Sequence, residues 1–470
     1  MKHTIHGSRL IAAAVFLFIT LITPGIFAQN TAQDTTALQQ LLSGLSVEEK
    51  AAQVLMVSIA GNTAPDTKSI AAFKGIVPGA VLLFGYNIAG TPQETAAFLK
   101  SATQSLRNAA QTSGHTAIPP LYALDNEGGT VYRTRRITAP LSAAEDIGTR
   151  FSVEQTRALY RLLGVQMKEL GIHLNLAPVA EARTAATAAA LGTRTYSADS
   201  DQAGRYAAAA VCGMQEASIL AAVKHFPGNG AADLHKGAAE LTADYETFIS
   251  RYCAVFQPSI AADAAAVLIS HITVPAVEAA PFCFSAKGIT LLRRTLGFSG
   301  LIITDDIAMK ALRQNGASPA ENAIRAIAAG CDMVMCSLPN IYPLIEAIAE
   351  KARTDAAFAR RLDEAVLQVL TAKQKADIIR ITAADVKAHS AGTAAHAAKP
   401  DSPAAKTAAH SNAHGSNAHG SNTDGSANTA AGTAEKTATN GNTGCIFPQH
   451  APNWELFRQA KAAAERTQHE

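Results

Sequence analysis

Short apolar runs alternate with longer alanine-rich segments between residues 35 and 380. Eight runs have the length of a buried β-strand. The segments between them carry apolar residues at the spacing of amphipathic helices. The predicted strands are Gln53–Ser58, Gly79–Phe84, Leu121–Asp125, Ile172–Ala177, Ile219–Lys224, Ala266–Ser270, Leu301–Thr304 and Asp332–Cys336.

Two helix starts in this region carry capping signals. Ser46 is followed three residues later by Glu49, which forms a capping box. Ser318 precedes Pro319, a cap residue followed by proline at the first helical position. The clearest predicted helices are Pro92–Ala110, Val153–Leu170, Ala203–Ala217, Pro319–Ala329 and Ile341–Arg353.

Eight strands that alternate with helices predict an α/β protein with a (β/α)8 TIM barrel as its single catalytic domain. A doubly wound open sheet is the alternative. It is less favoured because no glycine-rich phosphate turn follows the early strands. In a TIM barrel, the active site forms at the carboxyl ends of the strands.

Both ends of the chain differ from this region. Lys2 and Arg9 precede the apolar run Leu10–Thr23, so residues 1–28 are predicted to be an export signal cleaved after Ala28. Ile26 is larger than the usual residue three places before a cut, which leaves an uncleaved membrane anchor as the alternative. A periplasmic or secreted protein is expected, with no stable membrane insertion once the signal is removed.

The region after the barrel is of low complexity. Residues 382–442 are rich in small and polar residues and contain a pentad repeat, Ser411–Gly415, Ser416–Gly420 and Ser421–Gly425. A segment with so few apolar residues is predicted to be a disordered tail. Residues 443–470 are predicted to contain a short amphipathic helix, Trp454–Arg466, with Trp454 and Phe457 on one side. The whole chain is expected to be a monomer.

Composition excludes several classes of partner. The formal net charge is only +2 and is spread along the chain, so no nucleic-acid-binding surface is predicted. The six cysteines match neither a small disulfide scaffold nor a zinc site. No metal and no organic cofactor is expected.

Polar residues stand at the carboxyl ends of four predicted strands. Asp125 ends the third run, Lys224 and His225 the fifth, His271 the sixth and Asp305 the seventh. One such residue often caps the following helix. Four strand ends together favour an active site.

The sequences around these positions are specific, and together they resemble glycoside hydrolase family 3. The resemblance spans roughly residues 45–370 and lies closest to the β-N-acetylglucosaminidase branch, because an Asp-x-His loop follows Lys-His-Phe-Pro-Gly. The matching motifs are Leu124-Asp125-Asn126-Glu127-Gly128-Gly129 with Arg133, Lys224-His225-Phe226-Pro227-Gly228-Asn229-Gly230 with Asp233-Leu234-His235, and Ile303-Thr304-Asp305-Asp306-Ile307-Ala308-Met309.

The resemblance implies a retaining mechanism with three catalytic residues. Asp305 matches the nucleophile, and His235 matches the general acid/base that protonates the leaving oxygen and then deprotonates water. Histidine suits both tasks because it titrates near neutral pH. Asp233 is expected to orient His235. Asp306 is expected to be structural.

The resemblance also implies a set of sugar-binding residues, whose charged groups make strong hydrogen bonds to hydroxyls. His271 is a weaker candidate, and Glu181 stands where relatives often have Asp. The loop from Gly230 to Asp233 is two residues shorter than the family pattern. The expected sugar-binding residues are Asp125, Arg133, Arg194, Lys224 and His225.

The expected function is therefore that of a retaining exo-β-N-acetylhexosaminidase that removes terminal N-acetylglucosamine. Peptidoglycan fragments, chitin oligomers and host glycans all remain as natural substrates. The alternatives are another family 3 β-glycosidase, either a β-glucosidase or a phosphate-dependent enzyme, and a non-catalytic protein that binds cell-wall sugars.

Overall fold

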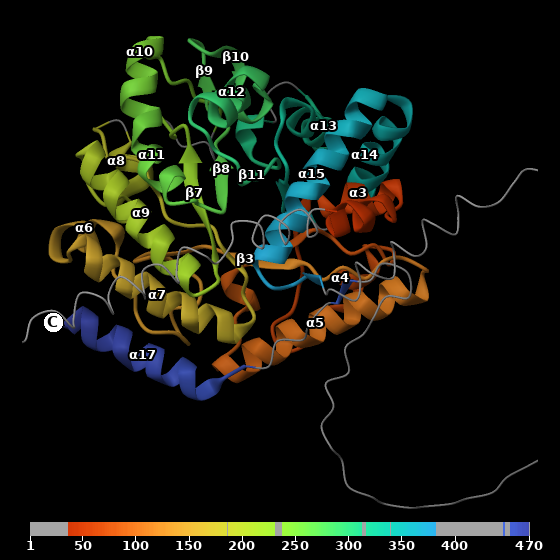
Figure 1. Ribbon diagram of the computed structural model, residues 1–470, viewed down its shortest axis with the longest axis horizontal. Helices are drawn as coiled ribbons and strands as arrows, with labels where there is room; N and C mark the ends of the chain where they lie inside the picture. The colour runs from red at the N-terminus through yellow and green to blue at the C-terminus, as the bar shows by residue number, and fades with distance from the viewer. Residues whose placement is uncertain are drawn as a thin grey trace, which may run out of the picture.

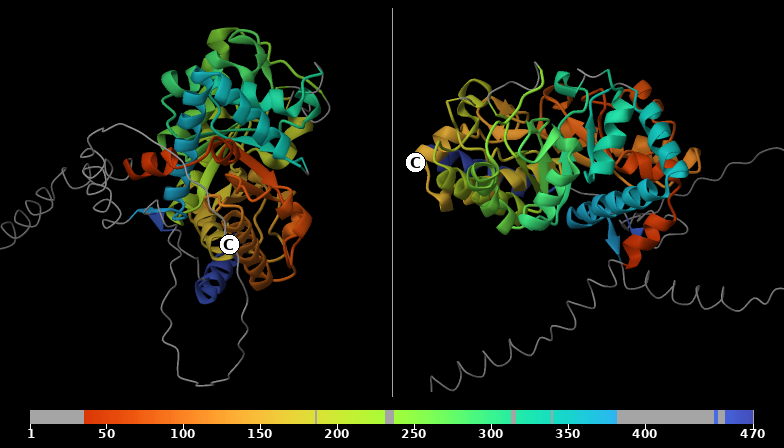
Figure 2. Two further views of the ribbon diagram at one scale, coloured as in Figure 1. Left: turned by 90° about the vertical axis from the view of Figure 1, so that its right-hand side faces the viewer. Right: turned by 90° about the horizontal axis from the view of Figure 1, so that it is seen from above.

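The computed structural model describes residues 36–185, 187–230, 237–312, 316–338, 340–381, 445–446 and 452–469. At its centre is a sheet of parallel strands with helices around the outside (Figure 1, Figure 2). The strand order is β11-β8-β7-β6-β3-β2-β1-β12, and a parallel bridge between Ile303 and Met333 joins the two ends. The sheet is therefore a closed barrel, which confirms the predicted (β/α)8 fold.

Each predicted apolar run forms one strand of the barrel. The fourth strand is shorter than predicted, because only Leu174 and Asn175 pair with both neighbouring strands. The fifth continues beyond its predicted end to Phe226. The strands are β1 Leu55–Ser58, β2 Ala80–Leu83, β3 Leu121–Leu124, β6 Leu174–Asn175, β7 Leu220–Phe226, β8 Ala266–Ile269, β11 Leu301–Thr304 and β12 Val334–Cys336.

The five predicted helices are present, with ends that differ by at most three residues. Both predicted caps form, and Ser318 makes a full capping box with Glu321. The structure adds a long helix, α15, that the sequence analysis did not name. The longer helices are α5 Pro92–Thr112, α7 Val153–Leu170, α9 Ser200–Glu216, α13 Pro319–Ala329, α14 Tyr342–Thr354, α15 Ala356–Lys375 and α17 Trp454–His469.

Shorter elements connect the βα units. Two hairpins, which the apolar pattern did not indicate, follow β3 and β8. A separate antiparallel pair joins Arg380–Ile381 (β13) to Cys445–Ile446 (β14). The hairpins after the barrel strands are β4 Asn126–Gly128 with β5 Val131–Tyr132, and β9 Thr273–Val274 with β10 Glu278–Pro281. The short helices are α3 Val47–Gln53, α4 Thr67–Ala71, α6 Ala144–Arg150, α8 Ala188–Leu191, α10 Tyr245–Thr247, α11 Gln257–Ala261 and α12 Ala286–Thr290.

The C-terminal helix α17 packs along α7 on the outside of the barrel (Figure 1). Phe457, Ala460 and Ala464 are buried on one face of α17, and Gln468 accepts a hydrogen bond from the Ser142 amide at 3.0 Å. The predicted amphipathic helix is confirmed, and it belongs to the barrel domain. The predicted signal (1–28) and the predicted disordered segment (382–442) lie outside the described residues.

In the part of the chain that the structure describes, no helix is long and apolar enough to span a membrane. Five cysteines in that part are unpaired, and four of them are buried.

A lysine is buried in α15 without a carboxylate partner among the described residues. Lys373 is fully buried, and its Nζ donates to Gln53 Oε1 at 2.7 Å. Gln53 in turn donates to the carbonyl of Val77 at 3.0 Å. Burial lowers the pKa of Lys373 well below its usual value of 10.5, because a neutral acceptor compensates little of the lost hydration of the ammonium group.

We expect Lys373 to make the free energy of unfolding depend on pH. Where folded Lys373 is neutral and unfolded Lys373 is protonated, the unfolded chain binds one more proton, so stability rises with pH by up to about 1.4 kcal/mol per unit. Urea denaturation between neutral and mildly alkaline pH should show that Lys373→Met removes this slope. The control Lys375→Met, at a half-exposed position of the same helix, should keep it. Equal slopes for wild type and Lys373→Met would refute this assignment.

Candidate active site

A cavity of about 290 Å³ opens at the carboxyl end of the barrel. The structure brings six of the eight predicted site residues to it, from segments far apart in the sequence. Asp305 is among them, and the other five are the predicted sugar-binding residues Asp125, Arg133, Arg194, Lys224 and His225.

Lys224 links two carboxylates in the wall of this cavity. Its Nζ lies 2.7 Å from Asp125 Oδ1 and 2.6 Å from Glu127 Oε1. Arg194 binds the same glutamate with two bonds, Nε to Oε2 at 2.7 Å and Nη2 to Oε1 at 2.9 Å. Arg133 Nη2 contacts Asp125 Oδ2 at 3.3 Å. Glu127, to which the sequence analysis assigned no role, thus joins Arg194 to the other three predicted residues.

The charges in this cluster stabilise one another. Burial alone would raise the pKa of Glu127, but Lys224 and Arg194 lower it to about 2. Burial opposes the charge of Lys224 too, yet Asp125 and Glu127 raise its pKa. Glu127, Lys224 and Arg194 are therefore ionised near neutral pH, and the cluster offers both charged donors and a charged acceptor to a ligand.

The β4–β5 hairpin places Glu127 in this wall. Asn175, at the end of β6, accepts from the Asn126 amide at 2.9 Å and donates to the Asn126 carbonyl at 3.0 Å. Gly128 has φ of +101°, and a Cβ there would lie 2.2 Å from the Ser142 carbonyl oxygen. Only glycine fits this close approach. The local sequence therefore fixes the direction of the Glu127 side chain.

Asp305 follows β11 directly, and its amide donates to the Ile269 carbonyl of β8 at 2.9 Å. Its Oδ1 accepts from the Asp306 amide at 2.8 Å. Burial would raise the pKa of Asp305, but His271, His225 and Lys224, with that hydrogen bond, lower it overall. Asp305 is therefore ionised at neutral pH, the state that a nucleophilic carboxylate needs.

Asp306 and His271 support the strand ends. Asp306 accepts from the Ala308 amide at 2.9 Å and binds the Ser337 hydroxyl, which joins the segments after β11 and β12. This agrees with the structural role predicted for Asp306. His271 Nε2 lies 3.0 Å from the Asp306 carbonyl, and the ring is buried. His271 therefore acts on Asp305 through its electrostatic field, and it is not among the residues that line the cavity.

Glu181, whose role the sequence left open, binds His225. Glu181 Oε1 lies 2.8 Å from His225 Nδ1, and Oε2 accepts from the Asn229 amide at 2.7 Å. A carboxylate at Nδ1 favours the tautomer that carries its proton there. His225 Nε2, 3.5 Å from Arg194 Nη2, is then left as an acceptor at the cavity. Glu181 is a positioning residue for His225.

The other two predicted catalytic residues, Asp233 and His235, lie outside the described residues. Their roles stay predictions. Asn229, shortly before them in the chain, lines the cavity. Among the described residues, no group of three or more His, Cys, Asp or Glu side chains is placed to hold a metal ion.

A closed (β/α)8 barrel with an ionised aspartate in a small polar cavity at its carboxyl end has the architecture of a TIM-barrel glycoside hydrolase. Residues 46–372 match the model of the glycosyl hydrolase family 3 N terminal domain. The chain belongs to this family, which confirms the resemblance seen in its motifs.

Several relatives of this chain are named as enzymes that hydrolyse amino sugars. The chain is 32% identical over 270 residues to a β-hexosaminidase of Stenotrophomonas maltophilia, covering 56% of this chain and 76% of that one. The structure of a β-N-acetylhexosaminidase from Beutenbergia cavernae superposes with a TM-score of 0.62 at 29% identity, and the superposition covers 70% of this chain and 99% of that one. The structure of a family 3 β-N-acetylglucosaminidase from Paenibacillus sp. superposes with a TM-score of 0.63 at 26% sequence identity. The superposition covers 71% of this chain and 63% of that one.

Replacing Glu181 by Gln should weaken substrate binding through His225. The amide is neutral and can donate as well as accept, so it no longer selects the His225 tautomer. We expect kcat/KM to fall about tenfold to a hundredfold, mainly through KM. Steady-state kinetics on an aryl glycoside should measure this, with the exposed Glu350→Gln as the matched control. A kcat/KM equal to that of the control would contradict the positioning role.

Proposed function

We propose that this chain is a retaining exo-β-N-acetylhexosaminidase that removes terminal N-acetylglucosamine from amino-sugar oligosaccharides. The observation that carries the proposal is Asp305, an ionised carboxylate in the cavity at the carboxyl end of the barrel. The names of the three relatives support the N-acetylated sugar.

The reaction proceeds in two displacements at the anomeric carbon. The Asp305 carboxylate attacks this carbon while the His235 imidazolium protonates the leaving oxygen, and a covalent glycosyl ester forms. His235, now neutral, then takes a proton from water, which attacks the same carbon and releases Asp305. The sugar leaves with its original β configuration. Asp233 orients His235 and stabilises its charged form.

The cavity wall supplies the groups that bind the sugar. Asp125 accepts hydrogen bonds from hydroxyls, and Lys224 and Arg194 donate to them. Arg133 also lines the cavity, and its Nε is buried without a hydrogen-bond partner among the described residues. A sugar hydroxyl or carbonyl oxygen would satisfy this donor. A volume of about 290 Å³ suits a single sugar ring, in keeping with exo action.

We also propose where this enzyme acts and which natural substrate it cleaves. Residues 1–28 direct the chain to the periplasm or the exterior. There it acts as a monomer on peptidoglycan fragments, and chitin oligomers and host glycans are the competing substrates. Product analysis with purified muropeptides and with chitobiose distinguishes them.

The activity is tested by comparing chromogenic aryl glycosides. Wild type should hydrolyse the N-acetyl-β-glucosaminide in preference to the β-glucoside, with no dependence on phosphate. Asp305→Asn should lower turnover at least about a thousandfold, because the amide cannot form the ester, while circular dichroism stays unchanged. Preference for the glucoside would indicate a β-glucosidase, and a phosphate requirement would indicate a phosphorylase. Sugar binding without turnover in wild type would indicate a non-catalytic protein.

The role of His235 is tested by varying the leaving group. His235→Ala should lose far more activity on chitobiose, whose sugar leaving group needs protonation, than on a dinitrophenyl glycoside, whose leaving group departs as an anion. The ratio of the two kcat/KM values measures the effect, and His115→Ala, on the segment between α5 and β3, serves as the control. An equal loss on both substrates would rule out acid catalysis by His235.

A further inference from the structure

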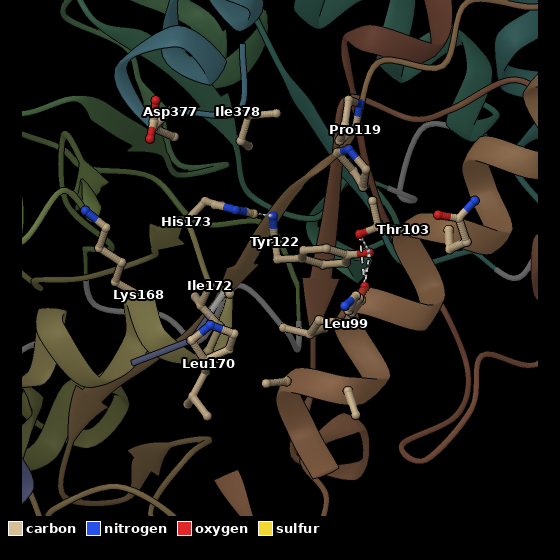
Figure 3. A pocket seen from close by; sticks show the side chains of 18 of the residues that line it. Leu99, Thr103, Pro119, Tyr122, Lys168, Leu170, Ile172, His173, Asp377 and Ile378 are labelled. Carbon is tan, nitrogen blue, oxygen red and sulfur yellow. Dashed lines mark hydrogen bonds between the residues drawn. The ribbon is translucent and has the colours of Figure 1, made fainter. Parts of the chain in front are cut away.

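A second and larger cavity, of about 480 Å³, lies at the opposite end of the barrel. It is bounded by α5 and by the residues that lead into β3 and β6 (Figure 3). Pro452 and Trp454, at the start of α17, complete its lining. Leu99, Leu170 and Ile378 are among the apolar residues around it. Its size falls within the usual range for sites that bind small organic molecules.

Two polar side chains in this cavity are satisfied by the protein. The Tyr122 hydroxyl lies 2.9 Å from Thr103 Oγ1 and 3.2 Å from the Leu99 carbonyl oxygen. His173 Nδ1 accepts from the Tyr122 amide at 3.0 Å, and the two rings stack (Figure 3). These groups form part of the cavity wall. Because they already have hydrogen-bond partners in the protein, they give no evidence for a ligand.

Arg107 is different. Its side chain lines the cavity and is only 7% exposed. No hydrogen bond and no ion pair joins its guanidinium to any part of the chain that the structure describes, and the guanidinium nitrogens are open to the space of the cavity. Burial without a counter-charge lowers the pKa of Arg107. A guanidinium that faces a cavity and has no carboxylate partner among the described residues keeps its N–H donors free to bind an anion.

Most of the other charged side chains around the cavity are also positive. Lys100, Lys168 and Arg380 line it, and Asp377 is the one acidic side chain among its described lining residues. Asp377 is already bound to Arg380, at 2.6 Å from Arg380 Nε. The field inside the cavity is therefore positive and attracts a negatively charged ligand.

We propose that this cavity binds a small organic carboxylate, whose anionic group pairs with Arg107 while its apolar body packs against Leu170, Ile378 and Trp454. A planar guanidinium binds a carboxylate through two parallel hydrogen bonds. The site is separate from the cavity at the carboxyl end of the barrel and does not rest on the proposed hydrolysis.

The chain provides its own reporter for this site, because Trp454 is the only tryptophan in the sequence and lines the cavity. The full chain is titrated with 3-phenylpropanoate under selective tryptophan excitation, and with the neutral analogue 3-phenylpropanamide. We expect a saturable change in fluorescence with the carboxylate, and an apparent Kd at least about tenfold weaker with the amide. This comparison uses wild type alone and holds even if no variant folds.

Substitutions at Arg107 provide a second test of this carboxylate site. Arg107→Met should weaken carboxylate binding at least about tenfold, while Arg107→Lys should retain part of the binding. Arg161→Met, at an exposed position of α7, is the matched control. No saturable change in wild type, equal affinity for acid and amide, or undiminished binding by Arg107→Met would overturn the proposal. Since binding is measured directly, the outcome does not depend on hydrolytic activity.

Discussion

The buried ammonium group of Lys224 is the interaction on which the active site depends. Removing this charge from water costs several kcal/mol, and only close ionic partners offset that cost. Asp125 and Glu127 lie within 2.7 Å of its Nζ, and Glu127 is held in turn by Arg194. The end of β3, the β4–β5 hairpin, β7 and the segment before α9 are thereby held in one arrangement. A site fixed in this way needs little reorganisation when a sugar binds.

Lys224 also acts on the nucleophile, together with two neighbouring histidines. Burial of Asp305 favours its neutral form, and the nearby His271, His225 and Lys224 favour the carboxylate strongly enough to lower its pKa overall. The balance is possible because β7, β8 and β11 are neighbours in the barrel and their carboxyl ends converge. The closed fold thus turns residues that are distant in sequence into one electrostatic unit.

The sequence predicted the barrel because each strand is a nearly continuous run of apolar residues. Such runs can be recognised without knowledge of tertiary contacts. It also predicted the residues at the strand ends, since the fold places them together. The roles of Glu127 and Glu181 were not predictable in this way. Glu127 meets Arg194 across 67 residues and Glu181 meets His225 across 44, and neither separation follows a helical or strand period. Arg107 likewise looks in sequence like an ordinary surface residue of an amphipathic helix.

The central claim, that Asp305 is the ionised nucleophile of a retaining enzyme, is tested most directly by trapping the glycosyl ester. A fluorinated N-acetylglucosaminyl donor with a good leaving group slows breakdown of the ester, and mass spectrometry of the intact chain and its peptides locates the adduct. The account predicts one N-acetylhexosaminyl-derived group on the peptide that contains Asp305, and none in Asp305→Asn. An adduct on another carboxylate, or hydrolysis of an unmodified substrate that inverts the anomeric configuration, would contradict it.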